Sequence, residues 1–589
     1  MGLGPLHEIS QEVDMVKMLA DLVIMNGRVV TVDKNFSIKQ AVAVKDGKIV
    51  AVGKDEEVKS FISRGTKVLD IHGKPILPGI NDSHMHGVFW GGTMPPLALD
   101  LRYPTVKSIR DISELVRKKV ESTRCGEWIP GFGWDPGYLE ECKENLNRFP
   151  TRWDIDPVSP NNPTFFIDFS GHTLLANSEA IRLAGITKDT PNPPGGEIEK
   201  DPNTGEVTGI FKELSAQALV SKVVPLYTKG QKREAILSAI RCLNAEGITS
   251  YTDAALGPGG DNYSGGLMGA DCIDVYKELC EEEKLTARVT IMMLFGEYGA
   301  LSFDDLKKEL ANSKIPEGWR NEWLRIPGVK IFADGIPPTK TAWMYEEYVG
   351  GGYGSLCVPG KTDEEKYNEL VNMIVYSHKR GVQIGVHATG GRAIDATVDG
   401  FIKAMQGKPS RKNPRHYIIH GDFISEQCAK RMAEHSIGVN VQPGIKWTIS
   451  EYMDTLLGKD RSARQWPLRM LLEAGIHLSA SSDAPVTYPN WRQGVQSAIL
   501  REAKASGEVS GSEYCITIEE AIRMYTISGA WQDHMEKIKG SIEVDKLADF
   551  CVLGEDILTI DPHKIKDIPV LMTITGGKIV YNPGEDFFK

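Results

Sequence analysis

The stretch that decides the fold is Ile76-Leu77-Pro78-Gly79-Ile80-Asn81-Asp82-Ser83-His84-Met85-His86, an apolar run that ends in two histidines one residue apart. In a β-strand, residues i and i+2 project from the same face, with their Cα atoms about 6–7 Å apart. Two imidazoles that leave one strand end together can bind a single divalent metal. A lone His-x-His pair is common, so its meaning depends on further candidate ligands in the chain.

Length and composition limit the classes of protein. The 589 residues exceed the usual size of a single hydrophobic core, so we expect a large core with appended domains. A hydrophobic content of 41% and a charged content of 25% are typical of a soluble globular protein. The net charge of -11 and the lack of a basic run argue against nucleic acid as a partner and against an anionic membrane surface. The sequence contains no run of 18 apolar residues, so we expect no transmembrane helix.

The cysteines and the N-terminus indicate a compartment. The 9 cysteines are dispersed without a Cys-x-x-Cys pair, which is typical of reduced thiols in a cytoplasmic protein. The N-terminus lacks the charged and apolar regions of a signal peptide. We therefore expect a cytoplasmic protein in which residues 1–18 form a loosely ordered extension.

Both chain ends are rich in short strands. The turns Asp46-Gly47-Lys48-Ile49-Val50 and Gly576-Gly577-Lys578-Ile579-Val580 repeat one strand–turn–strand pattern near opposite ends of the chain. Each end is too short to fold well alone. We expect residues 19–75 and 540–589 to combine into one small β-sandwich domain.

Between the ends, apolar strand-like runs alternate with helical stretches such as Asp363–Lys379 and Glu426–Glu434. The runs are Pro75–Ile80, Gly247–Thr252, Arg288–Leu294, Gly328–Phe332, Val382–Val386, Tyr417–Ile419, Gly438–Val441 and Ile476–Ala480. This alternation predicts an α/β fold with a parallel sheet, and eight units predict a closed (β/α)8 TIM-like barrel over residues 76–539.

One connection is far longer than the others. The segment of roughly residues 88–243, between the first and second barrel strands, is too long for a loop. It is rich in Pro, Gly and Trp. We expect an inserted subdomain that caps one end of the barrel.

Candidate ligands follow several predicted strands. They are His84 and His86 on the first strand, Lys330 on the fourth, His387 on the fifth, His420 on the sixth and Asp483 after the eighth. In a barrel, catalytic residues lie at the carboxyl ends of the strands, so these side chains should converge. Imidazoles with a carboxylate suit zinc or a similar metal.

Each of these residues has a plainer interpretation. A single histidine at a strand end is more often packed or exposed to solvent. Lys330 could pair internally with Asp334, and Asp483 could cap the following helix. Their combination at so many strand ends is what favours a metal site.

The same residues lie within an ordered series of motifs. These are Asn26-Gly27-Arg28, Leu77-Pro78-Gly79-Ile80-Asn81-Asp82-Ser83-His84-Met85-His86, Gly131-Phe132-Gly133-Trp134-Asp135, Ser170-Gly171-His172, Val329-Lys330-Ile331-Phe332-Ala333-Asp334-Gly335, Val386-His387-Ala388-Thr389-Gly390-Gly391-Arg392-Ala393 and Ser482-Asp483-Ala484-Pro485-Val486. With these motifs the chain resembles the amidohydrolase superfamily of metal-dependent hydrolases, in its amidohydrolase family 3 or YtcJ-like branch.

The resemblance implies a role for each candidate ligand. His84 and His86, with Asp483, would bind the more buried metal, and His387 and His420 the more exposed one. A carboxylated Lys330 and a hydroxide would bridge two metals, expected to be Zn2+, with manganese or iron as alternatives. Asp483 would act as general base on the bridging water and return the proton to the leaving nitrogen.

The function that the resemblance implies is hydrolysis of a non-peptide carbon–nitrogen bond in a small molecule, such as an N-acyl, N-formyl or cyclic amide. A single-metal heterocycle deaminase is the alternative, although such enzymes usually carry a glutamate near the fifth strand and no carboxylated lysine. A metal-free, non-enzymatic scaffold is the third reading. Relatives are commonly homodimers, so we expect a homodimer here.

Four further residues are candidates for substrate binding. His172 follows an apolar strand in the insert and could reach the active site. Trp134, Trp343 and Trp447 could line an apolar pocket. Structural roles in the cap or the core account for all four residues as well. The chain departs from the branch around the expected substrate, as in Gly390-Gly391-Arg392-Ala393, so no relative's substrate can be transferred directly.

Overall fold

The structure of the chain is a computed structural model. It describes residues 19–144, 148–169, 171, 173–193, 197–261, 264–296, 302–313, 321–407 and 413–584. The expected N-terminal extension of residues 1–18 lies outside these ranges.

Eight parallel strands form the centre of the molecule. They are β8 (Ile80–Met85), β15 (Ile248–Leu256), β16 (Arg288–Leu294), β17 (Leu324–Phe332), β18 (Gln383–Ala388), β19 (Tyr417–His420), β20 (Gly438–Val441) and β21 (Leu478–Ala480). The last strand returns to the first, where the backbone N–H of His86 donates to Ala484 O at 2.8 Å and that of Asp483 to His84 O at 3.0 Å. The predicted α/β barrel is confirmed as a nearly closed ring.

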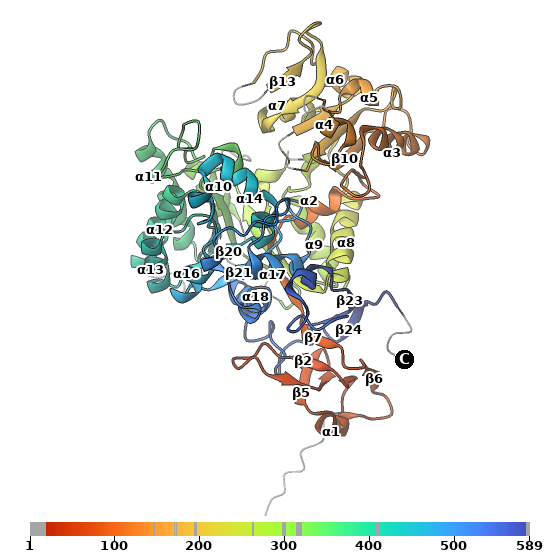
Figure 1. Ribbon diagram of the computed structural model, residues 1–589, viewed down its shortest axis with the longest axis vertical. Coiled ribbons are helices and arrows are strands. Elements are labelled where there is room, and N and C mark those ends of the chain that lie inside the picture. Colours follow the sequence, from red (N-terminus) through yellow and green to blue (C-terminus); the bar gives the residue numbers. More distant parts are fainter. Residues whose placement is uncertain are drawn as a thin grey trace, which may run out of the picture.

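Helices surround this ring (Figure 1). They include α2 (Gly87–Gly92), α8 (Lys229–Ala245), α9 (Asp271–Glu281), α10 (Phe303–Asn312), α11 (Asp363–Lys379), α12 (Gly391–Gln406), α13 (Glu426–Glu434), α14 (Pro443–Leu457), α15 (Lys459–Ser462), α16 (Leu468–Glu473), α17 (Trp491–Leu500), α18 (Ile518–Met524) and α19 (Ile527–Gln532). The Thr362 and Ser425 hydroxyls cap α11 and α13 by accepting from backbone N–H groups, so both helices begin where the sequence predicts. The strands of the ring are covered on both faces, and β15 is buried at every position, including polar residues such as Asp253.

The first barrel strand differs from its prediction. The run expected as one strand, Pro75–Ile80, is divided at Gly79 into β7 (Pro75–Pro78), which pairs with β2 (Arg28–Val30) and β22 (Phe550–Leu553), and β8. A Cβ at residue 79 would lie 2.0 Å from Thr249 Oγ1, so only glycine fits at this crossing. Both strands are fully buried. The burial of the residues therefore does not mark the crossing, although their polarity changes after Ile80, the first residue of β8.

The chain ends form two sheets on one side of the barrel. One has the order β5 (Lys48–Gly53), β4 (Ala41–Lys45), β1 (Leu22–Met25), β6 (Lys67–Asp70), and the other β24 (Lys578–Tyr581), β23 (Val570–Thr575), β22, β7, β2, β3 (Ile38–Lys39). Side chains from both sheets share one apolar cluster that includes Val42 and Phe550. Residues from the two chain ends thus bury each other.

The segment after β8 has a sheet of its own. Its order is β13 (Glu197–Lys200), β14 (Val207–Lys212), β12 (Thr173–Ala176), β11 (Thr164–Asp168), β10 (Ile129–Trp134), β9 (Leu99–Asp100), and its helices are α3 (Ile109–Glu121), α4 (Glu140–Glu144), α5 (Arg152–Ile155), α6 (Ser178–Leu183) and α7 (Glu213–Ser221). Figure 1 shows this sheet and the terminal sheets at opposite ends of the long axis. None of the helices in the described part of the chain has the length and apolar character that a membrane crossing requires.

Candidate metal centre

The predicted ligands gather at the carboxyl ends of the barrel strands. His84 lies in β8 and His86 directly follows it, Lys330 lies in β17, His387 in β18, His420 ends β19 and Asp483 follows β21. The register of the parallel strands places these positions at one rim, because β18 pairs with both β17 and β19 there.

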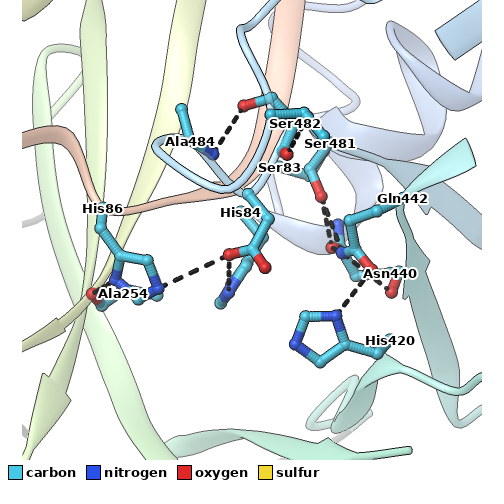
Figure 2. A network of polar contacts seen from close by, with 12 residues as sticks. Ser83, His84, His86, Ala254, His420, Asn440, Gln442, Ser481, Ser482 and Ala484 are labelled. Atoms are coloured by element: carbon cyan, nitrogen blue, oxygen red, sulfur yellow. Dashed lines mark hydrogen bonds and ion pairs between the residues drawn. The ribbon is translucent and has the colours of Figure 1, made fainter. Parts of the chain in front are cut away.

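The closest group consists of His84, His86 and Asp483. Asp483 Oδ1 lies 3.3 Å from His84 Nε2 and 3.5 Å from His86 Nε2. The two imidazole rings have centroids 5.4 Å apart, and Figure 2 shows them side by side below the loop of Ser482 and Ala484. One donor atom from each of the three residues lies within 4.8 Å of the others, a spacing that could hold one metal ion.

The other candidates continue from this group. The ring centroid of His420 lies 5.7 Å from that of His84 and 4.5 Å from that of His387. The ammonium of Lys330 lies 4.6 Å from the ring centroid of Phe332. The ring centroids of Phe332 and His387 are 5.3 Å apart. The structure therefore brings all the predicted ligands into one buried cluster.

Burial sets the charge of the imidazoles. It is the largest cause that lowers the pKa of His387 to about 3; the charge of the nearby Lys330 acts in the same direction, and the contact with Gly335 O opposes the shift. Burial also holds the pKa of His84 and of His420 well below the usual value. The pKa of His86 is likewise lowered by burial, against the opposing charge of Asp483. Neutral imidazole is the form that binds metals.

Lys330 is affected in the same direction. Its side chain is 1% exposed, and burial lowers the pKa of its ammonium to about 7, although the charge of Asp483 opposes the shift. A substantial fraction of this lysine is therefore a neutral amine near neutral pH.

The residues fit the metal that the sequence predicts. Neither ring nitrogen of His84 nor Asp483 Oδ1 has a hydrogen-bond partner among the described residues, although all three atoms are buried. Buried polar atoms without a partner are rare and costly. A cation among these imidazoles and the carboxylate would satisfy them, and a donor set of nitrogen and oxygen suits zinc.

Fixed acceptors orient three of the histidines. His86 Nδ1 lies 2.9 Å from Ala254 O, His387 Nε2 lies 3.0 Å from Gly335 O, and His420 Nδ1 lies 2.7 Å from Gln442 Oε1. The first and third contacts are drawn in Figure 2. Each contact leaves the other ring nitrogen available for a metal.

The sequence analysis missed these acceptors. Gln442 directly follows β20, one of three barrel strands for which no ligand was predicted, at the rim where the predicted ligands lie. Its position after a strand is a signal that could have been read. Ala254 and Gly335 contribute only backbone oxygens, which no residue type reveals.

Two plainer interpretations do not hold. The Asp334 carboxylate accepts from the backbone N–H groups of Trp343, Thr389 and Gly390 at 2.8–3.0 Å, so it binds the loops after β17 and β18. The helix after β21 is capped by Asn490, whose side chain accepts from the N–H groups of its first turn. Lys330 and Asp483 are thus free for the metal centre.

The predicted substrate residues lie in different places. Trp134 is buried in the core of the insert, where its Nε1 donates to Phe166 O at 3.3 Å. Trp343 is buried in the main core, and the guanidinium carbon of Arg392 lies 4.1 Å from the centroid of its ring. Trp447 is half-buried and lines a cavity. His172 lies outside the described residues. Their roles in substrate binding stay predictions.

That cavity has a volume of about 380 Å³. Its walls include Phe169 of the insert, Trp447 of α14 and Tyr488, together with Asp82 and Ser482, which are neighbours of the ligands in sequence. No predicted ligand is among its lining residues. The cavity therefore adjoins the metal centre without containing it.

Comparison with known proteins identifies the family of the chain. A sequence model of the amidohydrolase family matches residues 67–581, so the chain belongs to that family, as its motifs predict. The N-substituted formamide deformylase of Arthrobacter pascens is 28% identical over 571 residues, which cover 96% of this chain and 98% of that protein. The putative amidohydrolase YtcJ of Bacillus subtilis is 28% identical over 549 residues, covering 92% and 96%.

A solved structure shares the fold. An uncharacterized metal-dependent hydrolase from Pyrococcus horikoshii superposes with a TM-score of 0.71 at 22% identity, over 92% of this chain and 99% of that one.

Proposed function

We propose that this protein is a metal-dependent hydrolase that cleaves a carbon–nitrogen bond of an amide type in a small molecule. The observation that carries the proposal is that buried atoms of His84 and Asp483, which face each other among neutral imidazoles, have no hydrogen-bond partner among the described residues. Donor atoms arranged in this way are suited to binding a cation and to few other ligands.

The residues take the following roles. His84, His86 and Asp483 would hold one metal ion, His387 and His420 would hold a second, and Lys330 would contribute a ligand as a carbamate. A neutral amine is the form that adds to CO2, and the lowered pKa of Lys330 supports this modification. When bound, zinc would supply an activated water and would polarise the substrate carbonyl. Asp483 accepts the proton of that water and passes it to the leaving nitrogen.

The substrate class follows the relatives. A curated relative that aligns along nearly the whole chain is named for the removal of formyl groups from N-substituted formamides. N-formyl compounds are therefore the first substrates to examine, followed by N-acyl and cyclic amides. The residues after His387 are Ala388, Thr389 and Gly390, so the glutamate expected of a deaminase does not follow β18.

The remaining expectations belong to the same proposal. Residues 19–75 and 540–589 act as a composite β-sandwich domain, and residues 88–243 as a cap over the barrel of residues 76–539. The protein works as a homodimer in the cytoplasm.

A panel of substrates tests the function. The zinc-loaded protein is incubated with N-substituted formamides, N-acyl amino acids, lactams, hydantoins and carbamates, and release of the amine is measured. We expect turnover of at least one amide class and its loss in Asp483→Asn. Hydrolysis of matched esters alone would contradict the cleavage of a C–N bond.

A further inference from the structure

Three side-chain amides form a buried chain that leads to the metal centre. Gln532 of α19, Asn440 of β20 and Gln442 after β20 are hydrogen-bonded in series, and the last of them contacts His420. All three side chains are buried, with at most 3% exposure. Figure 2 shows the Asn440–Gln442–His420 part of this chain beside Ser481.

A backbone carbonyl fixes one end of the chain. Gln532 Nε2 donates to Ser83 O at 2.8 Å, and this carbonyl belongs to the residue before His84. A carbonyl oxygen can only accept, so the amide of Gln532 cannot be turned over. Its Oε1 must therefore face Asn440 and Ser479.

The orientation of the Gln532 amide determines that of the Asn440 amide. Asn440 Nδ2 donates to Gln532 Oε1 at 3.3 Å and to Ser479 Oγ at 3.0 Å, while the Ser479 hydroxyl donates to Gln532 Oε1 at 2.6 Å. Because both protons of the Asn440 amide are used on this side, its Oδ1 faces Gln442. The hydroxyl of Ser481 donates to the same Oδ1 at 2.7 Å.

The third amide is then determined. Gln442 Nε2 donates to Asn440 Oδ1 at 2.8 Å and to Ser481 Oγ at 3.0 Å. Turning this amide over would place two oxygens against each other in a buried site. Gln442 Oε1 therefore points to His420 Nδ1, 2.7 Å away, and can only accept.

We propose that Gln442 is a positioning residue that holds His420 in the Nδ1–H tautomer, with the Nε2 lone pair directed to the metal. His86 and His387 are oriented by backbone carbonyls, whose polarity is fixed. A glutamine at this position could either donate to or accept from the imidazole. The hydrogen bonds of Gln532 and Asn440 leave only the Gln442 oxygen facing His420. The tautomer follows from the hydrogen bonds alone, and its effect on metal binding rests on the proposed function.

Metal affinity separates this role from a purely structural one. Zinc affinity and stoichiometry are measured by titration against a competing chelator for the wild type, Gln442→Met and Gln383→Met. Gln383 is the matched control, since it is a buried glutamine of β18 whose Nε2 donates only to the backbone oxygens of Arg415 and Gln532.

We expect Gln442→Met to weaken one of two zinc sites by about 10–100-fold, the usual effect of removing the residue that orients a ligand. Gln383→Met should bind zinc normally. Equal affinities for Gln442→Met and Gln383→Met would overturn the proposal.

A second measurement does not depend on metal. Neutron diffraction from the deuterated, metal-free protein should show a deuteron on His420 Nδ1 and both deuterons of the Gln442 amide directed to Asn440 and Ser481. A deuteron on Nε2, with the Gln442 amide reversed, would overturn the inference. If the wild type binds no zinc, the proposed function fails, and the position of this deuteron still decides the role of Gln442.

Discussion

Arg288 and Asp549 form a buried, two-pronged ion pair between the barrel and the terminal sheets. Arg288 Nε lies 2.7 Å from Asp549 Oδ2 and its Nη2 lies 2.9 Å from Oδ1, and both side chains are at most 4% exposed. Arg288 begins β16, and Asp549 directly precedes β22. A charge pair therefore links two parts of the chain that are far apart in sequence.

Removing one partner of this pair should destabilise the protein strongly. In Asp549→Ala the guanidinium of Arg288 is left buried without its counter-charge, at a cost of about 3–5 kcal/mol in the free energy of unfolding. Urea unfolding followed by tryptophan fluorescence measures the change. The double variant Arg288→Met/Asp549→Leu, which leaves no buried charge, should lose less than Asp549→Ala. A larger loss in the double variant would contradict this account.

The metal centre predicts a specific dependence on His84. His84→Asn removes a ligand of only one of the two proposed metal sites, so bound zinc should fall by about one ion per chain and turnover should fall to background. Metal content is measured by mass spectrometry of the purified protein. His477→Gln is the control, because this histidine stacks on Trp531 at 4.0 Å and is not one of the predicted ligands. Full zinc content in His84→Asn would refute the proposed site.

Lys330 should be replaceable by an added carboxylate. If Lys330 carries the proposed bridging carbamate, Lys330→Ala should lose most of the activity and regain part of it with formate, acetate or propionate. Lys446→Met offers a matched control, since Lys446 is also buried, has a pKa lowered to about 7 by burial, and donates to Ser462 O instead. No recovery with any short carboxylate would argue against the bridge.

Asp253 should make stability depend on pH. Burial raises its pKa from 3.8 to about 7, although Tyr276 and the N–H of Val88 donate to its Oδ2 and oppose the shift. The native state therefore binds more protons than the unfolded state between these values, and the contribution of Asp253 is lost as pH rises through about 7.

The variant Asp253→Asn tests this dependence. Asp253 Oδ1 has no hydrogen-bond partner among the described residues, so an amide can replace the protonated acid there. Relative to wild type, the variant should gain stability from pH 5 to pH 8.5, by a few kcal/mol at most, since one pKa unit corresponds to about 1.4 kcal/mol. Urea unfolding of both proteins at both pH values measures this difference in stability. The same difference between variant and wild type at pH 5 and at pH 8.5 would reject the raised pKa of Asp253.

Trp447 should influence the choice of substrate. It lines the cavity beside the metal centre, so Trp447→Ala should raise KM about ten-fold for amides with aromatic N-substituents and leave small formamides less affected. Trp134→Phe is the contrast, because Trp134 packs in the insert core and should change stability only. Uniform loss of activity on all substrates would count against a pocket role for Trp447.

Much of the site could be predicted from the sequence because parallel strands end at one rim. His84, His387 and His420 could each be assigned to a strand end, and the barrel then brings them together without knowledge of any loop. The division of the chain at Gly79 was not predicted, because Ile80 continues the apolar run beyond the glycine and both strands are fully buried. The role of Gln442 depends on hydrogen-bond direction through residues from four elements, which leaves no local pattern.

The crossing at Gly79 also bears on the order in which the protein is made. β7 needs β22 as its neighbour, and β22 follows the whole barrel in the sequence, so the strand that leads into His84 has both its partners only after the barrel has been synthesised. Asp483, which faces His84, is also synthesised long after it. The first predicted ligands are therefore made long before the segments that enclose them, and we expect metal to be loaded only once those segments are in place.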